Sequence, residues 1–403
     1  MKKIMKGIGL PAVFSLGLAV PVCKAHADTD LQFNKWVETV KINGDYRLRH
    51  EMFHKKTAGQ VDRSRQRFRL RLNLDFGLPS KFTARTTVAS GTGEPVSTNQ
   101  SFDGLSSQKS IWIDKAYLVW QPLEVIRLQG GRMENPIWRP YSSDVLWDTD
   151  FNPEGFSQSV SKLVGPVNVF VNAIQMVLDE DSGFNNTEGI NTTAPTTRTD
   201  ANGQRDQWMF GEQVGVEFRL PLESRLKVAV ANYNWVNERY GDLGAGTNNE
   251  GNRRSVASST GSLVNNFNVN EFTGQLSGWI ARVPVQILGT YVVNHGARAD
   301  FNPKEDTGWQ VGGIVGKAGP KHGWEAAYFR KHVRTDATVA DVADADFGDG
   351  GTNREGHIFW LAYSPLEWMV MQAKYFQTKV INAALAPGMD DINRAQFDVS
   401  VKF

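Results

Sequence analysis

Hydrophobic and polar residues alternate along much of the chain, and residues 63–75, RSRQRFRLRLNLD, show this pattern most clearly. The odd positions from 63 to 71 are all arginine, and the even positions from 68 to 74 are phenylalanine or leucine. Successive side chains of a β-strand point to opposite faces. The segment is therefore predicted to form a strand with one cationic face and one hydrocarbon face.

Similar alternation recurs in segments of about ten residues, the length that a tilted strand needs to cross a membrane. Examples are VEFRL (216–220), RLKVAV (225–230), NEFTGQLSG (270–278) and RAQFDVSVKF (394–403). After residue 30 no window approaches the roughly eighteen apolar residues of a membrane-spanning helix. The pattern predicts sixteen strands, near 40–51, 65–76, 81–90, 111–121, 124–132, 154–162, 167–177, 207–220, 225–236, 268–281, 285–294, 308–316, 323–332, 355–363, 367–378 and 393–403.

The connections between these strands alternate in length. Seven are short, and each contains one proline, which fixes φ and cannot donate a hydrogen bond to a neighbouring strand. The seven prolines are Pro79, Pro122, Pro166, Pro221, Pro284, Pro320 and Pro365. Between the short turns lie eight longer segments rich in Gly, Asn, Asp and Thr, at 52–64, 91–110, 133–153, 178–206, 237–267, 295–307, 333–354 and 379–392.

This alternation predicts the fold class. A soluble β-sandwich, the alternative, has no reason to place every long loop at one end, whereas outer-membrane barrels have short periplasmic turns and long outer loops. We therefore expect an all-β protein, one sixteen-stranded antiparallel transmembrane β-barrel with short periplasmic turns and long extracellular loops. Arginine on the lipid face costs about 2–4 kcal/mol at mid-bilayer, so the leucine face of 63–75 should contact lipid and the arginine face should line the lumen.

Composition excludes other classes. The chain has 403 residues, a formal charge of +1, 40% hydrophobic residues and a mean hydropathy of −0.38. Nucleic-acid-binding domains are usually markedly basic, and helical membrane proteins are far more apolar. Only one cysteine is present, so disulfide bonds cannot hold the fold together.

The first residues resemble an export signal. Lys2, Lys3 and Lys6 precede an apolar stretch from residue 8 to 20, and Ala25-His26-Ala27 forms a small-x-small cleavage pattern. We expect a signal peptide at 1–27 and a mature barrel at 28–403. Removing Lys2, Lys3, Lys6 and Lys24 changes the formal charge from +1 to +1 − 4 = −3.

Several stretches resemble the bacterial putative-porin family of sixteen-stranded outer-membrane barrels. They are GDYRLRHE (44–51), RQRFRLRL (65–72), GTGEPVSTNQ (91–100), DKAYLVWQP (114–122), GGRMENPIWRP (130–140) and WDTDFNPEGFS (147–157). These stretches span the first third of the mature chain. The remainder of the chain resembles the family in its regular succession of β-hairpins and in its terminal phenylalanine. Val119 lies where the resemblance implies an acidic residue.

Two sets of charged residues are expected to line the pore. The first is an arginine ladder on strands one to five: Arg47, Arg49, Arg65, Arg67, Arg69, Arg71, Arg85 and Arg127, with Arg132 at its outer end. The second is a set of inward acids on later strands: Glu217, Glu271, Glu325 and Asp398. Opposed walls of unlike charge would focus permeating ions. The alternative is structural bracing, with each arginine paired to Asp45, Glu51, Asp75 or a loop carboxylate.

The third loop, residues 133–153, is aromatic and acidic. In general porins a loop at this place folds inward and narrows the pore, so the resemblance implies a constriction. The alternative is a loop packed over the rim. The constriction candidates are Trp138, Arg139, Tyr141, Asp144, Trp147, Asp148 and Asp150.

Two further motifs suggest ligands but lack essential positions. DADFGDG (344–350) lacks the twelfth-position glutamate of a standard calcium loop, so an acidic, solvated loop is the expected alternative. GTGEP (91–95) has neither Gly-Lys-Ser/Thr nor a following helix, so it is no phosphate-binding loop. We expect no metal, no cofactor and no catalytic residue.

The function expected is an outer-membrane porin, a water-filled channel for passive diffusion of small hydrophilic solutes with a weak preference for anions. An adhesin or receptor acting through the outer loops is the first alternative. A barrel enzyme is the second, and it needs a Ser/His or Asp/His group at the rim. No mature histidine lies in a Gly-x-Ser-x-Gly context.

The expected location is the outer membrane of a Gram-negative bacterium. The expected partners are membrane lipid, lipopolysaccharide, small hydrophilic or anionic solutes and a homotrimer, with no nucleic acid. The C-terminal strand ends at Phe403 after alternating apolar residues, which resembles the signal that the barrel-assembly machinery reads.

Overall fold

The computed structural model describes residues 34–56, 61–179, 206–238, 251–254, 263–297, 304–385 and 389–403. The chain divides into two compact units, Met1–Trp36 and Val37–Phe403, and the strands described below belong to the second. The expected signal peptide at 1–27 lies outside the described residues. No helix in the described part of the chain has the length and apolarity needed to cross a membrane.

The second unit is a β-barrel. Its strands are Thr39–Lys55 (β1), Arg63–Leu78 (β2), Phe82–Ser90 (β3), Gln100–Ser101 (β4), Ile111–Leu123 (β5), Ile126–Arg132 (β6), Glu154–Val164 (β7), Val167–Asp179 (β8), Gln207–Arg219 (β9), Arg225–Val236 (β10), Asn268–Ile280 (β11), Val283–Asn294 (β12), Thr307–Gly316 (β13), Trp324–Val333 (β14), Arg354–Leu366 (β15), Met369–Val380 (β16) and Ile392–Lys402 (β17). Short 3₁₀ segments lie at Pro79–Lys81 (η1), Gly104–Ser106 (η2) and Ala340–Val342 (η3).

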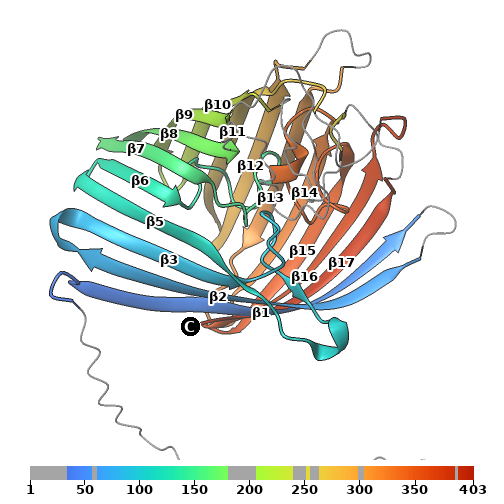
Figure 1. Cartoon of the computed structure of the whole chain (residues 1–403), viewed down its shortest axis with the longest axis horizontal. Coiled ribbons are helices and arrows are strands. Elements are labelled where there is room, and N and C mark those ends of the chain that lie inside the picture. Colours follow the sequence, from blue (N-terminus) through green and yellow to red (C-terminus); the bar gives the residue numbers. More distant parts are fainter. Residues whose placement is uncertain are drawn as a thin grey trace, which may run out of the picture. The chain divides into compact units, whose positions relative to one another are not determined.

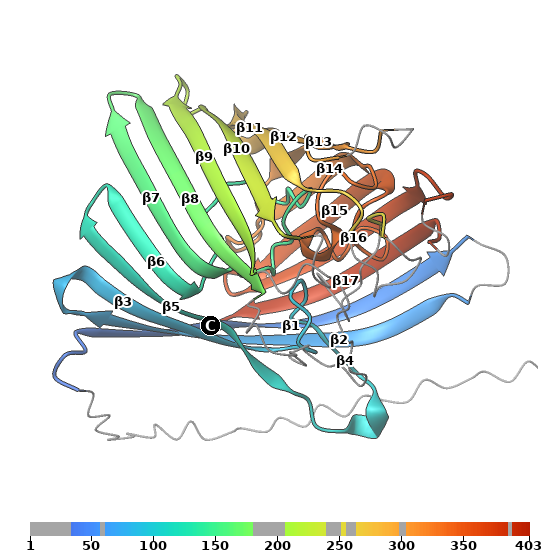
Figure 2. The same cartoon turned by 45° about the horizontal axis from the view of Figure 1, so that its top comes forward.

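The strands pair antiparallel in chain order, and β1 pairs with both β2 and β17, which closes the ring (Figures 1 and 2). Of the seventeen strands, β4 has only two residues and lies against β2 beside β3, so sixteen strands form the ring. The prediction of a sixteen-stranded antiparallel barrel is confirmed. Each predicted strand is present, because alternation over about ten residues specifies both the element and its faces.

The prolines do not all form the turns that the sequence predicted. Pro122, Pro284 and Pro365 lie inside the ends of β5, β12 and β15. Between β11 and β12 the turn residues are Ala281 and Arg282, with φ of 46° and 72°. Proline cannot adopt positive φ, so it flanks such a two-residue turn and does not form it.

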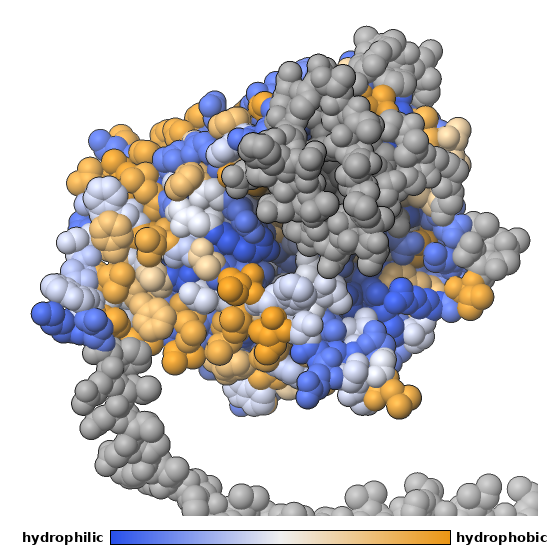
Figure 3. All heavy atoms as spheres, in the orientation of Figure 1, coloured by the Kyte–Doolittle hydropathy of each residue, from blue (hydrophilic) through white to orange (hydrophobic). Residues whose placement is uncertain are grey.

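The two faces of each strand have different side chains. On the outward face of β1, Tyr46, Leu48 and Met52 are exposed, and Figure 3 shows hydrophobic side chains gathered over the outer wall of β3 and β5. On the inward face of β2, the side chain of Arg71 contacts Asp150 of the third loop. The leucine face of 63–75 is therefore outside the barrel, and its arginine face is inside.

Two long loops run inside the ring of strands, the third loop (133–153) after β6 and the segment 334–353 after β14 (Figure 2). Their buried apolar side chains pack against the inward faces of β8–β12. We call these inward faces the packed side. The cluster consists of Tyr117, Val119, Met133, Ile137, Val145, Leu146, Trp147, Ile174, Met176, Met209, Ala231, Tyr233, Trp235, Leu263, Phe267, Val269, Val292, Val333, Ala337, Val339 and Val342.

The inward position of 334–353 corrects the expectation of an acidic, solvated loop at 344–350. Asp344 is 5% exposed and Phe347 is 1% exposed. Phe347 packs against Phe376 of β16, and the Asp344 carboxylate accepts a hydrogen bond from Lys331. Apolar residues outside the acidic motif, such as Val339 and Val342, drive the burial of the whole loop.

Candidate functional site

The candidate site lies where the arginine ladder faces the two inward loops. Most ladder arginines lie on the inward faces of β1 and β2. We call these two faces, together with the neighbouring inward faces of β16 and β17, the ladder side. Between the ladder side and the loops is a cavity of about 210 Å³. Its charged lining residues are Arg47, Arg49, Arg69, Lys374, Asp144, Asp148, Asp150, Asp344 and Asp346.

At the centre of the ladder side, Arg49 is buried and bonded to three carboxylates. Its guanidinium donates to both oxygens of Asp398, over 2.7 and 2.8 Å, and to Asp346 over 3.2 Å. It also lies 3.3 Å from Glu51 on the same strand. Charge-assisted bonds of this bidentate kind fix the side chain firmly, so Arg49 joins β1 to β17 and to the 334–353 loop.

The arginines of β2 are also paired. Arg69 bonds to Asp45 over 2.6 Å, and Arg71 bonds to Asp150 over 2.5 Å. Arg65 bonds to Glu51, whereas Arg67 lies 3.8 Å from that carboxylate and donates to the carbonyl oxygen of Asn99. The ladder is therefore an ion-pair network in which most arginines already have an acid partner.

Sequence reasoning missed one member of this network. Arg394 of β17 is 1% exposed, and its guanidinium bonds to Glu51 over 2.8 Å and to Asp346 over 2.7 Å. The alternation of RAQFDVSVKF places Arg394 on the same face as Asp398. This shared face could have identified Arg394 as an inward residue from the sequence.

The remaining predicted arginines are Arg47, Arg85, Arg127 and Arg132. Arg47 donates to Asn99 over 2.6 Å and is 3.8 Å from Asp398. Arg85 lies 3.5 Å from Asp75, and Arg127 donates to Gln129 over 2.9 Å. Arg47 lines the cavity, but Arg85 and Arg127 do not. Arg132, at the outer end, pairs with Glu154 over 2.7 Å.

The four predicted acids occupy different surroundings. Asp398 belongs to the arginine network, and Glu217 lies 3.7 Å from Arg225. Glu325 accepts a hydrogen bond from the indole N–H of Trp360 over 2.8 Å. Glu271 is 3% exposed on the packed side and accepts a hydrogen bond from the Tyr233 hydroxyl over 2.7 Å. Glu271 therefore faces packed side chains and not open water.

The third loop is attached to several walls of the barrel. The backbone N–H of Trp138 donates to Gln213 of β9, and the Ser143 hydroxyl lies 2.6 Å from that of Thr290 on β12. Gln310 of β13 donates to the carbonyl oxygen of Ser142, and Lys331 of β14 donates to that of Asp144. These contacts show that the loop crosses the interior from β9 to β14.

Aromatic contacts and one arginine hold the loop in shape. Trp147 is 2% exposed and packs against Tyr233, Trp235 and Phe151, with ring centroids 5.4–5.9 Å apart. Arg139 donates to the carbonyl oxygens of residues 147 and 148. Of the other predicted aromatics, Trp138 packs edge-on against Phe170 of β8, and Tyr141 packs edge-on against Trp360 of β15.

The two inward loops also bind each other. The backbone N–H of Asp148 donates to the carbonyl oxygen of Val342 over 2.8 Å, and the N–H of Ala345 donates to the Asp148 carboxylate over 2.9 Å. Lys331 bridges them further, because it bonds to Asp344 over 2.8 Å as well as to the Asp144 carbonyl. The loops therefore form one unit inside the barrel.

The loop carboxylates titrate over a wide range. Burial and the charge of Asp344 raise the pKa of Asp144 to about 6. Burial and the neighbouring Asp150 raise the pKa of Asp148 above its ordinary value. Burial also acts to raise the pKa of Asp150, but the guanidinium of Arg71 holds it well below the ordinary value. In the same way Arg394 and Arg49 outweigh burial and lower the pKa of Asp346.

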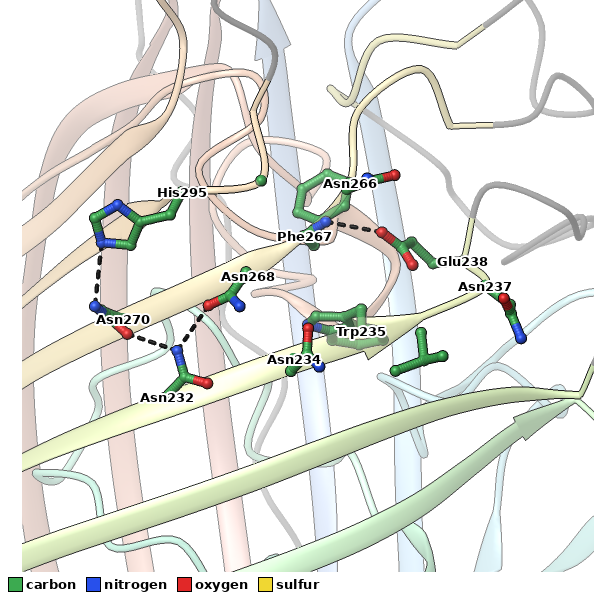
Figure 4. Close-up of a pocket in the computed structure, with 12 residues that line it drawn as sticks. Asn232, Asn234, Trp235, Asn237, Glu238, Asn266, Phe267, Asn268, Asn270 and His295 are labelled. Carbon is green, nitrogen blue, oxygen red and sulfur yellow. Dashed lines mark hydrogen bonds between the residues drawn. The ribbon is translucent and has the colours of Figure 1, made fainter.

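A second concave region, of about 750 Å³, lies at the loop ends of β10 and β11 (Figure 4). It is lined largely by amides, and Asn232 donates to both Asn268 and Asn270. Asn270 lies 3.1 Å from His295, and Glu238 accepts from the backbone N–H of Phe267. Within the residues that the structure describes, no three His, Cys, Asp or Glu side chains lie together as metal ligands would.

Comparison with known proteins gives one family. The family described as "Putative porin" matches residues 54–243 and 263–403. No curated protein matches the chain.

Solved structures share the fold. The chain is similar to OprB of Pseudomonas putida at high pH, with 10% identity over 90% of this chain and 94% of that one, and a TM-score of 0.54. It is also similar to OmpF of Salmonella typhi in complex with daunomycin, with 11% identity over 90% and 97% of the two chains, and a TM-score of 0.51. At such identities the likeness shows the fold alone.

Proposed function

Because the chain belongs to the putative porin family, we propose that it is an outer-membrane diffusion channel whose path passes the cavity beside the ladder side and weakly favours anions. A porin is a channel and not an enzyme, and we infer the bacterial outer membrane as the location. The solute class and the ion preference go beyond family membership and depend on the interior of the barrel.

The unequal filling of the interior supports this path. The packed side is covered by buried apolar side chains, which exclude water. The ladder side carries charged and amide groups around the cavity of about 210 Å³. Ions need a hydrated, polar wall, so the ladder side offers the better route. We assign Arg47, Arg49, Arg69 and Asp398 to this wall and Tyr141, Asp144 and Asp150 to the constriction opposite.

The charge balance supports a weak preference and not a strong one. Most ladder arginines are paired with acids, so their fields are largely cancelled at short range. Lys374 is the exception on this wall, since among the described residues no carboxylate oxygen lies within 4.0 Å of its ammonium group. Its ammonium group gives this wall an uncancelled positive charge, which should raise the concentration of anions along the wall. The Asp144 carboxylate of the third loop opposes this effect, so the preference should be weak.

We also propose that residues 1–27 are removed on export and that the mature barrel forms a homotrimer. The observation that favours self-association is the segment around η2, which projects from the barrel in both views (Figures 1 and 2). Its Leu105 is fully exposed and its Phe102 is 58% exposed. Exposed apolar groups of this kind commonly mark a contact with another chain.

Single-channel recording tests the proposal. Purified protein added to a planar bilayer in KCl should produce discrete conductance steps, and the reversal potential in a KCl gradient should show a modest chloride preference. A bilayer that stays closed would contradict the channel, whereas steps with potassium preference would contradict only the assigned selectivity.

A further inference from the structure

Among the described residues, the cavity on the ladder side has one ammonium group without an ion-pair partner and one carboxylate oxygen without a hydrogen-bond partner. Of its carboxylates, Asp150 pairs with Arg71, Asp344 with Lys331 and Asp346 with Arg49. The Asp148 carboxylate accepts two backbone N–H groups, from residues 150 and 345. Asp144 is different, because its Oδ1 is buried and has no hydrogen-bond partner among the described residues.

The cations of the cavity divide in the same way. Arg49 and Arg69 are bonded to carboxylates at close range. The Lys374 ammonium instead lies 5.5 Å from the ring centre of Trp360 and 4.8 Å from that of Phe376. Arg47 is 3.8 Å from its nearest acid, Asp398, and its Nε is buried without a partner in the described part of the chain.

Lys374 and Asp144 do not form an ion pair with each other. Both line the cavity, yet no ion pair within 4.0 Å joins them. Trp360, which lies beneath the ammonium of Lys374, packs edge-on against Tyr141, three residues before Asp144. The cavity thus contains an unpaired ammonium group, an aromatic wall and a carboxylate oxygen without a hydrogen-bond partner among the described residues.

A buried polar group without a partner is costly, so such groups favour a ligand that supplies the missing bonds. A solute with one carboxylate and one ammonium group would satisfy both groups at once. A simple anion or a simple cation would satisfy only one group and would be repelled by the other.

We propose that this cavity is a binding site for small zwitterionic solutes of the amino-acid class, with Lys374 and Arg47 binding the carboxylate and Asp144 binding the ammonium group. This inference rests on the proposed channel function and names its solute class. The volume of about 210 Å³ is below the roughly 300–1,000 Å³ of drug-sized sites, so one small molecule fits. The aromatic wall of Tyr141 and Trp360 would contact its aliphatic part.

The experiment compares three probes of similar size on single channels in KCl at neutral pH. The probes are L-alanine, which is zwitterionic, propionate, which lacks the ammonium group, and ethylammonium, which lacks the carboxylate. L-alanine should interrupt the current at a concentration about ten-fold lower than either analogue, because it makes both ion pairs. Equal effects of all three probes would overturn the inference.

Two variants test the two charged groups of the site. In Asp144→Asn the effect of L-alanine should fall to that of propionate, and in Lys374→Gln it should fall to that of ethylammonium. The matched controls are Asp103→Asn, in the exposed loop near η2, and Lys379→Gln, an exposed residue on β16 outside the cavity. Both controls should keep the advantage of L-alanine. An advantage that survives in both Asp144→Asn and Lys374→Gln would also overturn the inference.

Recording in KCl alone separates the possible failures. Closed bilayers with the unaltered protein would reject the channel itself, whereas normal steps without an L-alanine advantage would reject only the site. If Asp144→Asn forms no channel, Asp144→Ser is used in its place. If Lys374→Gln forms no channel, Lys374→Met is used in its place. Each second substitution removes the same charge as the first.

Discussion

The ladder side and the packed side hold the same two loops by different forces. On the packed side Trp147, Met209 and Tyr233 are almost fully buried. There the loops are held by the hydrophobic effect and by close packing of apolar side chains. On the ladder side Arg49, Arg71 and Arg394 hold the loops through carboxylates at 150 and 346. Packing of the first kind is less sensitive to salt and pH than ion pairs are.

The difference explains how a barrel can be filled and still conduct. Glycines on the packed side make room for large rings, since a Cβ at Gly215 would lie 2.1 Å from the Phe170 ring. The ladder side instead has long cationic side chains around a cavity. The packed side therefore anchors the loops. The ladder side leaves a polar route whose charge depends on the ionisable side chains around it.

The largest expected effect comes from breaking the packed side. Trp147→Ala removes a buried ring that touches Tyr233, Trp235 and Phe151, which typically costs about 3–5 kcal/mol. The third loop should detach from the wall, and single-channel conductance should rise several-fold. Trp147→Phe, which keeps an aromatic ring there, is the control. Unchanged conductance in Trp147→Ala would show that the loop does not limit the pore.

The next effect tests the ladder side. Replacing Arg67, Arg69 and Arg71 together by serine leaves Asp45 and Asp150 without their ion pairs. The permeability ratio of chloride to potassium should fall several-fold, because arginine stays charged at any working pH and its loss is not compensated. Reversal potentials in a KCl gradient measure this ratio. Arg132→Ser at the outer end is the control, and an unaltered ratio in the triple variant would show that the ladder only braces the barrel.

A smaller effect concerns pH. The pKa of Asp144 is about 6, so this carboxyl is ionised at neutral pH and becomes neutral as the pH falls through 6. Asp150 and Asp346 stay ionised because their pKa values are lowered. Chloride preference should therefore rise about two-fold between roughly pH 7.5 and pH 5. Asp144→Asn should reduce the change, whereas Asp103→Asn should keep it. Asp148, whose pKa is also raised, should account for the change that persists in Asp144→Asn.

The smallest expected effect comes from breaking one partly exposed ion pair, Asp45–Arg69. Asp45→Asn leaves Arg69 without its carboxylate partner, and both side chains are partly exposed, at 15% and 19%. The free energy of unfolding should change by no more than about 1 kcal/mol, because solvent screens such pairs. Chloride preference should increase by less than about two-fold. Thermal unfolding in detergent and reversal potentials check the two parts, and a large loss of stability would mean that the ladder is mainly structural.

The sequence alone determined the barrel. Strand positions, the outward leucines and inward arginines of β2 and the order of short and long connections all follow from local patterns. These features are local, because the period of two and the turn chemistry act over a few residues. Alternation was enough to place Arg47, Arg49 and Asp398 on the interior face.

Only the tertiary structure decided which charges meet and which loops fold inward. Arg49 and Asp398 are 349 positions apart, and Arg49 and Asp346 are 297 apart, so no local pattern joins them. The sequence of residues 344–350 predicted an acidic, solvated loop, but apolar residues earlier in the 334–353 loop pack against the third loop and the strands, so the loop is buried. Burial and ion pairing depend on all surrounding elements at once, and closure of the ring between β1 and β17 is what brings those elements together.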